Sequence, residues 1–298
     1  MSAGTSFSEC TARQRLARLL DEGSLRELLP PASRVISPHL AALGLPCAFD
    51  DGVVIGLARL AGRPVAVAAQ EGAFMGGGVG EVHGAKLVGL FRRAVRERVD
   101  AVLLLAESGG VRLHEANAGL IAVSEVMRAL LDTRAAGIPV IVLIGGANGC
   151  FGGMGLVARC ADRVLMSDVG RLAMSGPEVI EASHGVEEYD ARDRALVWRT
   201  SGGKHRWLTG DCDALVEDDV AAFRAAAIAS LDAAAPVTLA SLQAEHALLA
   251  QRLAMAQDLP MGDEAVELWR RLGVAEPERV ADREVAALRR PASIEGAA

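Results

Sequence analysis

Residues 145–155 read GGANGCFGGMG and join a predicted strand to a predicted helix. The preceding residues 138–144 (IPVIVLI) are continuously apolar and rich in β-branched side chains, which is typical of a strand buried on both faces. Residues 156–160 (LVARC) have the pattern of the first turns of a buried helix. A glycine turn between these elements exposes backbone N–H groups, and the helix N-terminus adds partial positive charge. The stretch therefore predicts a site for an anion, either a bound phosphate or an oxyanion formed during a reaction.

Two further glycine-rich turns precede this one along the chain. Residues 74–80 (FMGGGVG) follow a predicted hairpin of strands at residues 53–60 and 64–70. Residues 107–111 (ESGGV) follow a predicted strand at residues 101–106. Each turn lies at the C-terminal end of its strand, the edge at which open α/β sheets bind ligands.

Helical periodicity dominates the rest of the chain, and most of all its last third. Residues 11–28 carry a helical stripe of leucines, with Gly23 as the predicted C-terminal stop. Further helices are predicted over residues 81–98, 114–134, 189–200, 218–234, 239–256, 263–272 and 276–288, with another opening at Pro177. Short strands are predicted over residues 163–166, 172–174 and 214–216. Pro236 interrupts the pattern, so we expect an α/β domain over residues 1–235 and a helical extension over residues 236–298.

Composition excludes several classes of function. The formal net charge of −7 leaves no basic excess for non-specific binding to nucleic acid. No apolar run is long enough to predict a membrane span, and five scattered cysteines without a CxxC pair favour reduced thiols in a cytoplasm. The six histidines are dispersed, and none is spaced for a metal site. We therefore expect a cytoplasmic protein that binds no metal.

The anion site has competing interpretations. A P-loop is disfavoured because no Lys-Ser or Lys-Thr follows GGMG, and residues 76–80 match the dinucleotide pattern only loosely. A serine hydrolase is disfavoured because Ser108 lies in ESGG and not in a GxSxG elbow, so its expected role is a turn or a cap. Plain loop geometry remains an alternative for each turn. An oxyanion hole needs two backbone donors, and the turns at residues 108–110 and 151–153 can supply one each.

Several segments, in a fixed order, resemble carboxyltransferase beta subunits of the acyl-CoA carboxylase group in the crotonase superfamily. They are TARQRLARLLDEGSL (11–25), DDGVVIGLARLAGRPVAVAAQEGAFMGGGVGEVHGAKL (50–87), ESGGVRLHEA (107–116), CFGGMG (150–155) and MSGPEVIE (174–181). Within that group the chain is most similar to beta subunits of malonate decarboxylases, because of its single crotonase-type half, Val111 and His114 in SGGVRLHE, and CFGGMG. The resemblance implies an α/β crotonase-like (ClpP/crotonase) ββα superhelix with additional C-terminal helices.

The resemblance also implies an activity and its partners. A malonyl thioester on an acyl carrier protein would lose carbon dioxide through an enolate and become the acetyl thioester. The carrier's arm would be a phosphoribosyl-dephospho-coenzyme A group, and this chain itself would bind no cofactor. The implied partners are a homologous gamma subunit, the acyl carrier protein and the acyl carrier protein transferase alpha subunit. Two alternatives stay open: the beta half of a biotin-dependent carboxyltransferase, as in acyl-CoA carboxylases or biotin-dependent malonate decarboxylases, and a non-catalytic scaffold that binds an acyl-CoA.

The superfamily pattern implies the N–H groups of Gly110 and Gly153 as oxyanion donors, with Val111 and Gly152 as the donors if the register is shifted by one. His114 is the candidate proton donor, with helix capping or packing as its alternative role. Weaker candidates for the proton are water and four side chains: His83, Glu107, Ser108 and Ser175.

Substrate contacts are expected from Ser108, Gly109 and Ser175. Lys204 and Arg206 belong to the densest basic stretch, residues 192–206. That stretch is either a solvated helix face with its loop or a docking patch for the acidic carrier or its phosphates.

Overall fold

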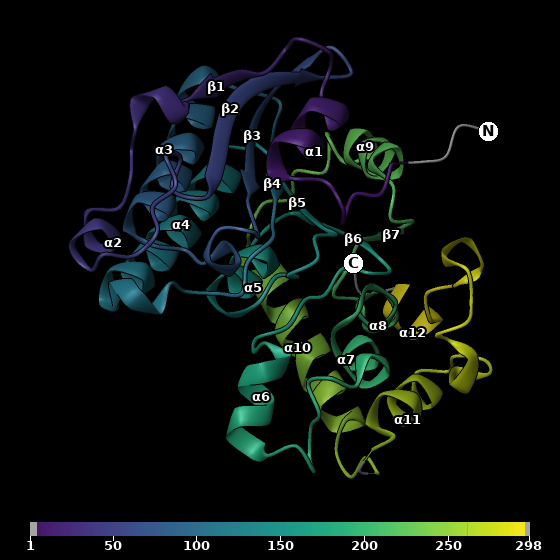
Figure 1. Ribbon diagram of the computed structural model, residues 1–298. Coiled ribbons are helices and arrows are strands. Elements are labelled where there is room, and N and C mark those ends of the chain that lie inside the picture. Colours follow the sequence, from purple (N-terminus) through teal and green to yellow (C-terminus); the bar gives the residue numbers. More distant parts are fainter. Residues whose placement is uncertain (1–4, 261, 296–298) are drawn as a thin grey trace.

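A mixed β-sheet forms the centre of the molecule (Figure 1). The structure is a computed structural model that describes residues 5–260 and 262–295. In this part of the chain, seven strands pair in sequence order. They are β1 (Arg26–Leu28), β2 (Val53–Leu60), β3 (Arg63–Gln70), β4 (Ala101–Leu105), β5 (Val140–Ile144), β6 (Arg163–Ser167) and β7 (Ala214–Val216). The first three strands are antiparallel, and all pairs from β3 to β7 are parallel.

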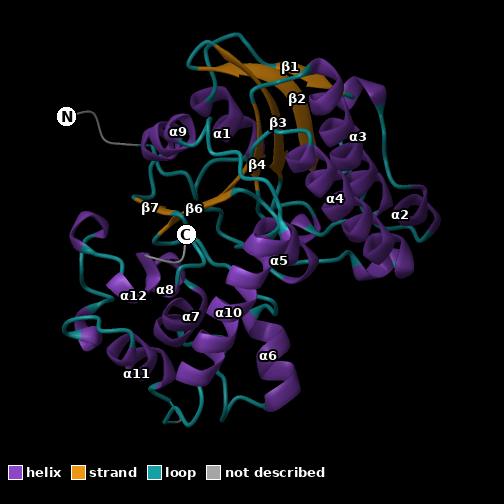
Figure 2. Ribbon diagram, turned by 180° about the vertical axis from the view of Figure 1, so that it is seen from behind, coloured by secondary structure: helices purple, strands orange, loops and turns teal. Residues whose placement is uncertain are grey.

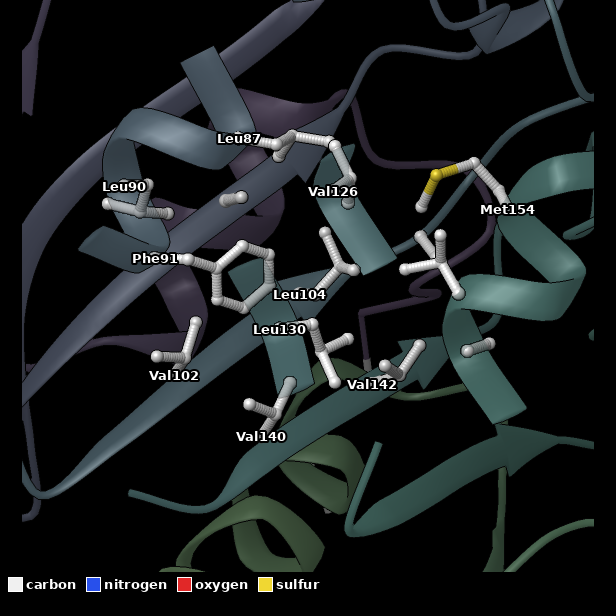
Figure 3. Close-up of a cluster of buried hydrophobic side chains, with 14 of the residues drawn as sticks. Leu87, Leu90, Phe91, Val102, Leu104, Val126, Leu130, Val140, Val142 and Met154 are labelled. Carbon is white, nitrogen blue, oxygen red and sulfur yellow. The ribbon is translucent and has the colours of Figure 1, made fainter. Parts of the chain in front are cut away.

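Helices cover one face of the sheet. Alternate residues of each strand point to this face, and their apolar side chains pack against the helices. Val102 and Leu104 of β4 belong to the apolar cluster on this face, whereas Leu103 belongs to the cluster on the other face. The covering helices are α3 (Glu81–Glu97), α4 (Asn117–Ala135) and α5 (Gly152–Arg159). Figure 3 shows side chains of these helices, such as Phe91, Leu130 and Met154, packed against the strands.

The opposite face is covered by α1 (Ala12–Leu19) and α9 (Val220–Ala229). A capping box at Thr11 begins α1, and its leucines Leu16 and Leu19 are fully buried. The rings of Phe7 and Phe223 lie 4.1 Å apart and close the space between the two helices. The N-terminal segment is therefore a structural part of the sheet domain.

Beyond the sheet, the chain is mainly helical and lies to one side of it (Figure 2). The helices of this part are α6 (Pro177–His184), α7 (Arg194–Ser201), α8 (Gly203–Thr209), α10 (Leu239–Met255), α11 (Glu264–Arg271) and α12 (Ala292–Glu295). Helix α2 (Pro38–Ala42) precedes the hairpin and lies beside α3 and α4 in both views (Figure 1, Figure 2). A third apolar cluster joins Leu208 of α8 to Trp269 of α11 and Val280. Packing thus crosses residue 235, and the division of the chain into domains at that point stays a prediction.

The hairpin and the strand–turn–helix order after it are confirmed. Some local predictions are wrong. The first helix ends at Leu19 and not at the predicted stop, Gly23, and residues 26–28 form β1 because β2 offers them an edge for pairing. Residues 172–174 form only a single bridge from Leu172 to Cys150, and residues 276–288 contain two short 3₁₀ turns instead of one helix.

Candidate functional site

The three glycine turns lie together at the C-terminal edge of the parallel strands. They follow β3, β4 and β5, which are neighbours in the sheet. Single parallel bridges join Val79 to Val111 and Ser108 to Cys150, so the pairing of the strands continues into the turns. Because parallel strands end at the same edge, turns that are far apart in sequence become adjacent.

The second and third turns are in direct backbone contact. The Ser108 N–H donates to the Gly149 carbonyl and the Phe151 N–H donates to the Ser108 carbonyl, both at 2.8 Å. Gly110 and Gly152 have φ angles of +126° and +57°, which favour glycine. A Cβ atom on Gly152 would also lie only 3.1 Å from the Gly110 Cα. Glycine is therefore needed here for both conformation and close approach.

The hydrogen bonds of these turns separate the four candidate donors into two pairs. The Gly110 N–H donates to Ser108 Oγ (3.1 Å), and the Gly152 N–H donates to the Met174 carbonyl (2.9 Å). The N–H groups of Val111 and Gly153 donate to no acceptor in residues 5–260 and 262–295. Gly153 is the second residue of α5, where a helix leaves its N–H groups unpaired and its dipole favours negative charge.

Ser108 and Gly109 stabilise the second turn. Ser108 is fully buried, and its hydroxyl contacts both the N–H and the carbonyl of Gly110. Gly109 is exposed, and its N–H donates to the Gly76 carbonyl at 2.8 Å. The first glycine turn therefore supports the second, and the Ser108 hydroxyl has the turn role predicted for it.

Cys150 lies in the third turn but is not placed to act as a nucleophile. Its side chain is fully buried, and burial raises the pKa of the thiol to about 12. The thiol is therefore protonated at neutral pH, and it packs in the apolar cluster under α4 and α5.

The two histidines near the turns differ in exposure. His114 is exposed in the 3₁₀ turn Leu113–Glu115, and within the described residues its side chain makes no hydrogen bond. His83 is fully buried, with Nδ1 3.1 Å from the Asp51 carbonyl oxygen and Nε2 3.0 Å from Gln70 Nε2. Burial lowers the pKa of His83 to about 3, so this ring is neutral. The structure leaves His114 available to a substrate and His83 enclosed in the core.

The remaining predicted residues lie outside the two turns. Ser175 is half-buried just before α6. Lys204 Nζ donates to the carbonyls of Ala281 (2.8 Å) and Arg283 (2.7 Å). Arg206 donates to the Leu172 carbonyl at 2.7 Å, and its guanidinium lies 3.1 Å from the Asp211 carboxylate. Both cations are therefore engaged within the chain.

The residues that directly follow the second turn form a buried ion cluster, which the sequence did not predict. Arg112 lies 3.0 Å from Asp51 and 2.8 Å from Glu115, and all three side chains are essentially inaccessible to solvent. Glu115 also accepts the Glu81 N–H at 2.6 Å, at the start of α3. Although burial opposes ionisation, the Glu81 N–H, the Ser37 side chain and Arg112 together hold the pKa of Glu115 below its usual range. The available signal was the Arg-x-x-Glu spacing directly after the SGGV turn.

The described part of the chain contains neither a candidate metal site nor a candidate membrane-spanning helix. In residues 5–260 and 262–295, no three His, Cys, Asp or Glu side chains gather as a possible metal site. None of the helices there is both long and apolar enough to cross a membrane.

A mixed sheet flanked by helices, with glycine turns adjoining at its carboxyl edge, is the architecture of crotonase-like carboxyltransferase domains. The sequence model of the carboxyl transferase domain matches residues 7–251, and the chain belongs to this family of enzyme subunits. The predicted crotonase-like fold is confirmed: the chain superposes on transcarboxylase 12S with a TM-score of 0.64 at 26% identity, over 75% of this chain and 41% of that one.

Two relatives are more similar and relate the chain to malonate decarboxylase subunits. A chain of the Pseudomonas malonate decarboxylase hetero-tetramer, solved in complex with malonate, has a TM-score of 0.81 and 42% identity over 90% of this chain and 97% of that one. The malonyl-S-ACP:biotin-protein carboxyltransferase MADC of Malonomonas rubra is 47% identical over 233 residues, which are 74% of this chain and 73% of that protein.

Proposed function

We propose that this chain is the beta-type subunit of a malonate decarboxylase and removes carbon dioxide from a malonyl thioester on an acyl carrier protein. The observation that carries the proposal is the pair of unpaired backbone donors, the Val111 and Gly153 N–H groups, on two turns in contact. Gly110 and Gly152 are the less favoured donors because their N–H groups already have acceptors.

The chemistry needs a stabilised oxyanion. The bond between the carboxylate carbon and the methylene carbon breaks, carbon dioxide leaves, and the electron pair delocalises onto the thioester oxygen as an enolate. Preorganised N–H donors at that oxygen lower the barrier, and one such donor typically contributes about 3 to 4 kcal/mol. A proton then adds to the carbanion carbon and gives the acetyl thioester.

We assign the proton transfer to His114. Its exposed imidazole follows the donor turn by a few residues and makes no hydrogen bond with the described residues, so it is free to meet a substrate. His83 and Glu107 are enclosed, which disfavours direct contact with the thioester. Water is the alternative donor.

The proposal includes the partners of the relatives. One solved relative is a hetero-tetramer, and a second Pseudomonas structure is an MdcD-MdcE hetero-dimer, 39% identical to this chain with a TM-score of 0.66. We propose a homologous gamma subunit, an acyl carrier protein with a phosphoribosyl-dephospho-coenzyme A arm, and the carrier's transferase alpha subunit.

Contacts with the carrier and its arm also belong to the proposal. Ser175 would touch the thioester arm, because it follows Met174, whose carbonyl accepts the Gly152 N–H. Lys204 and Arg206 would attract the acidic carrier through their positive charge while remaining bonded within the chain.

A second function is favoured by one specific relative. MADC is by name a carboxyltransferase from malonyl-S-ACP to a biotin protein, and it is 47% identical to this chain. The same enolate would form in that reaction, with the carboxyl group passing to biotin instead of leaving as carbon dioxide. The donor turns serve both reactions equally.

One assay separates these functions. The purified complex is mixed with malonyl carrier protein, and carbon dioxide release is measured with and without avidin. Release that avidin does not change is the expected result. Inhibition by avidin would favour the biotin-dependent reaction, and no release from a complete complex would favour a non-catalytic scaffold.

A further inference from the structure

We propose that Glu107 and Arg15 are positioning residues: their buried ion pair fixes the two donor turns relative to each other. This inference rests on the proposed function. Glu107 directly precedes Ser108, and Arg15 lies on α1, ninety-two positions away in sequence. Their side chains are 7% and 2% exposed, so the pair is shielded from water.

The Glu107 carboxylate contacts several segments at once. One oxygen pairs with the Arg15 guanidinium, and the other accepts the Asn148 N–H (3.2 Å) in the turn after β5. The backbone N–H of Glu107 donates to Gln70 Oε1 at 3.1 Å, at the end of β3. Glu107 therefore joins the ends of three neighbouring strands.

Three glycines, two after β3 and one after β5, make room for Glu107. A Cβ atom on Gly72 or Gly146 would collide with the Glu107 carboxylate, and one on Gly77 would collide with the Glu107 carbonyl. These glycines follow β3 and β5, on either side of β4 in the sheet. The glycine richness of the first and third turns thus has a second cause besides presenting donors: the backbone closes around one carboxylate.

Arg15 is held as firmly as its partner. Its Nε donates to the Phe7 carbonyl at 2.8 Å, and its guanidinium lies 4.8 Å from the centre of the Phe7 ring. A buried cation with fixed geometry penalises any movement of the carboxylate that neutralises it. Helix α1 is therefore part of the support for the site, although it covers the face of the sheet opposite α5.

The pair acts through the turns and not on the substrate. Glu107 is followed by the turn that contains the Val111 N–H, and Asn148 belongs to the turn that leads to the Gly153 N–H. A shift of about 1 Å in a catalytic group can lower a rate about a hundredfold. Loss of the pair should therefore lower kcat while leaving substrate affinity nearly unchanged.

The test compares Glu107→Gln with Asp162→Asn in the purified complex. Asp162 is a matched control: its side chain is 1% exposed, pairs with Arg134 and accepts the Val140 N–H, but at the other edge of the sheet. For each variant we would measure kcat and KM for malonyl carrier protein and thermal unfolding. Hydrogen exchange would be followed in peptides covering residues 106–112 and 146–154 and in a peptide covering α1, residues 12–19.

For Glu107→Gln we expect kcat to fall about a hundredfold, KM to stay within about threefold, and exchange to rise in both peptides. Asp162→Asn should lower the melting temperature with kcat and exchange in those peptides unchanged. If Glu107→Gln does not assemble, Arg15→Lys, which keeps the cation but loses the guanidinium fork, should lower kcat about tenfold.

Three outcomes would overturn the inference: unchanged kcat and exchange in a Glu107→Gln complex, exchange that rises only in α1, or an equal loss of kcat in Asp162→Asn. The wild-type complex separates this failure from failure of the proposed function. If wild-type protein releases no carbon dioxide, the proposed function fails, while the exchange data still decide whether Glu107 orders the turns.

Discussion

The two edges of the parallel sheet are built on opposite principles. At the N-terminal edge, carboxylates take up backbone N–H groups: Asp162 accepts those of Val140 (2.9 Å) and Ala235 (3.0 Å), and Asp213 accepts that of Val164 (2.7 Å). At the C-terminal edge, glycine turns leave the N–H groups of Val111 and Gly153 without an acceptor in the described chain. At the N-terminal edge these backbone N–H groups have acceptors within the chain. At the C-terminal edge two N–H groups are available to a ligand.

This difference separates stability from function. Val111 and Gly153 are half-buried, and a backbone donor there that neither water nor a ligand satisfies costs free energy. A fold keeps such a donor only where the rest of the structure enforces it. At the C-terminal edge the enforcing groups are the positive-φ glycines and the Glu107–Arg15 pair. Substitutions at the N-terminal edge should accordingly lower the free energy of unfolding, and substitutions at the C-terminal edge should lower kcat.

The largest effect is expected from removing a donor without changing the helix. Because a Cβ on Gly153 would meet Val123, the variant Gly153→Pro is made together with Val123→Ala. Proline is tolerated in the first turn of a helix, so α5 should survive. Loss of one oxyanion donor should lower kcat about a hundredfold or more.

The matched control is Gly153→Ala with Val123→Ala, which adds the same Cβ but keeps the N–H. We expect this control to retain most of the wild-type kcat. Equal activity in the two double variants would exclude the Gly153 N–H as a donor.

The next effect belongs to the other edge. Asp162→Asn replaces the carboxylate that neutralises Arg134 with an uncharged amide, and breaking such a buried ion pair costs about 3 kcal/mol. We expect the free energy of unfolding, measured with denaturant, to fall by about that amount while kcat per folded complex is unchanged. A loss of kcat comparable to that of the donor variant would remove the distinction between the edges.

A smaller effect on rate is expected at His114. If this exposed histidine delivers the proton, His114→Gln should lower kcat about tenfold or more and alter its dependence on pH. The stability of the complex should not change, because the side chain is exposed and unbonded in the described structure. A full rate with the wild-type pH profile would assign the proton to water.

The smallest effect concerns stability against pH. Burial lowers the pKa values of His83 and His205 to about 3, well below the value of about 6.5 for an unfolded chain. Between these values the unfolded chain binds more protons, so the free energy of unfolding falls as pH decreases. From pH 7 to pH 6 each histidine should contribute a loss of roughly 0.7 kcal/mol.

Denaturant titrations at the two pH values measure this loss. His83→Gln should reduce the decline by about the contribution of one histidine. A decline identical to that of wild type would show that His83 is not buried as a neutral ring.

Local patterns predicted the turns and their strands, because glycine content and apolar runs act within a few residues. They could not predict which N–H groups are free, since the acceptor for Gly152 is the distant carbonyl of Met174. The Arg15–Glu107 pair could not be predicted either, because its two residues are far apart in sequence. The sequence placed Lys204 on a solvated helix face or a docking patch. In the structure its ammonium group donates to the carbonyls of Ala281 and Arg283, which are distant in sequence.

The central claim, that the two turns bind the thioester oxygen, is tested most directly by infrared spectroscopy of the substrate. The complex is loaded with acetyl carrier protein whose thioester carbonyl is labelled with carbon-13, and the carbonyl stretch is recorded. Hydrogen bonds from preorganised donors should move this band to lower frequency in wild type and in Gly153→Ala with Val123→Ala. The shift should be largely lost in Gly153→Pro with Val123→Ala. A band at the frequency of free carrier in wild type, or an equal shift in both double variants, would contradict the account.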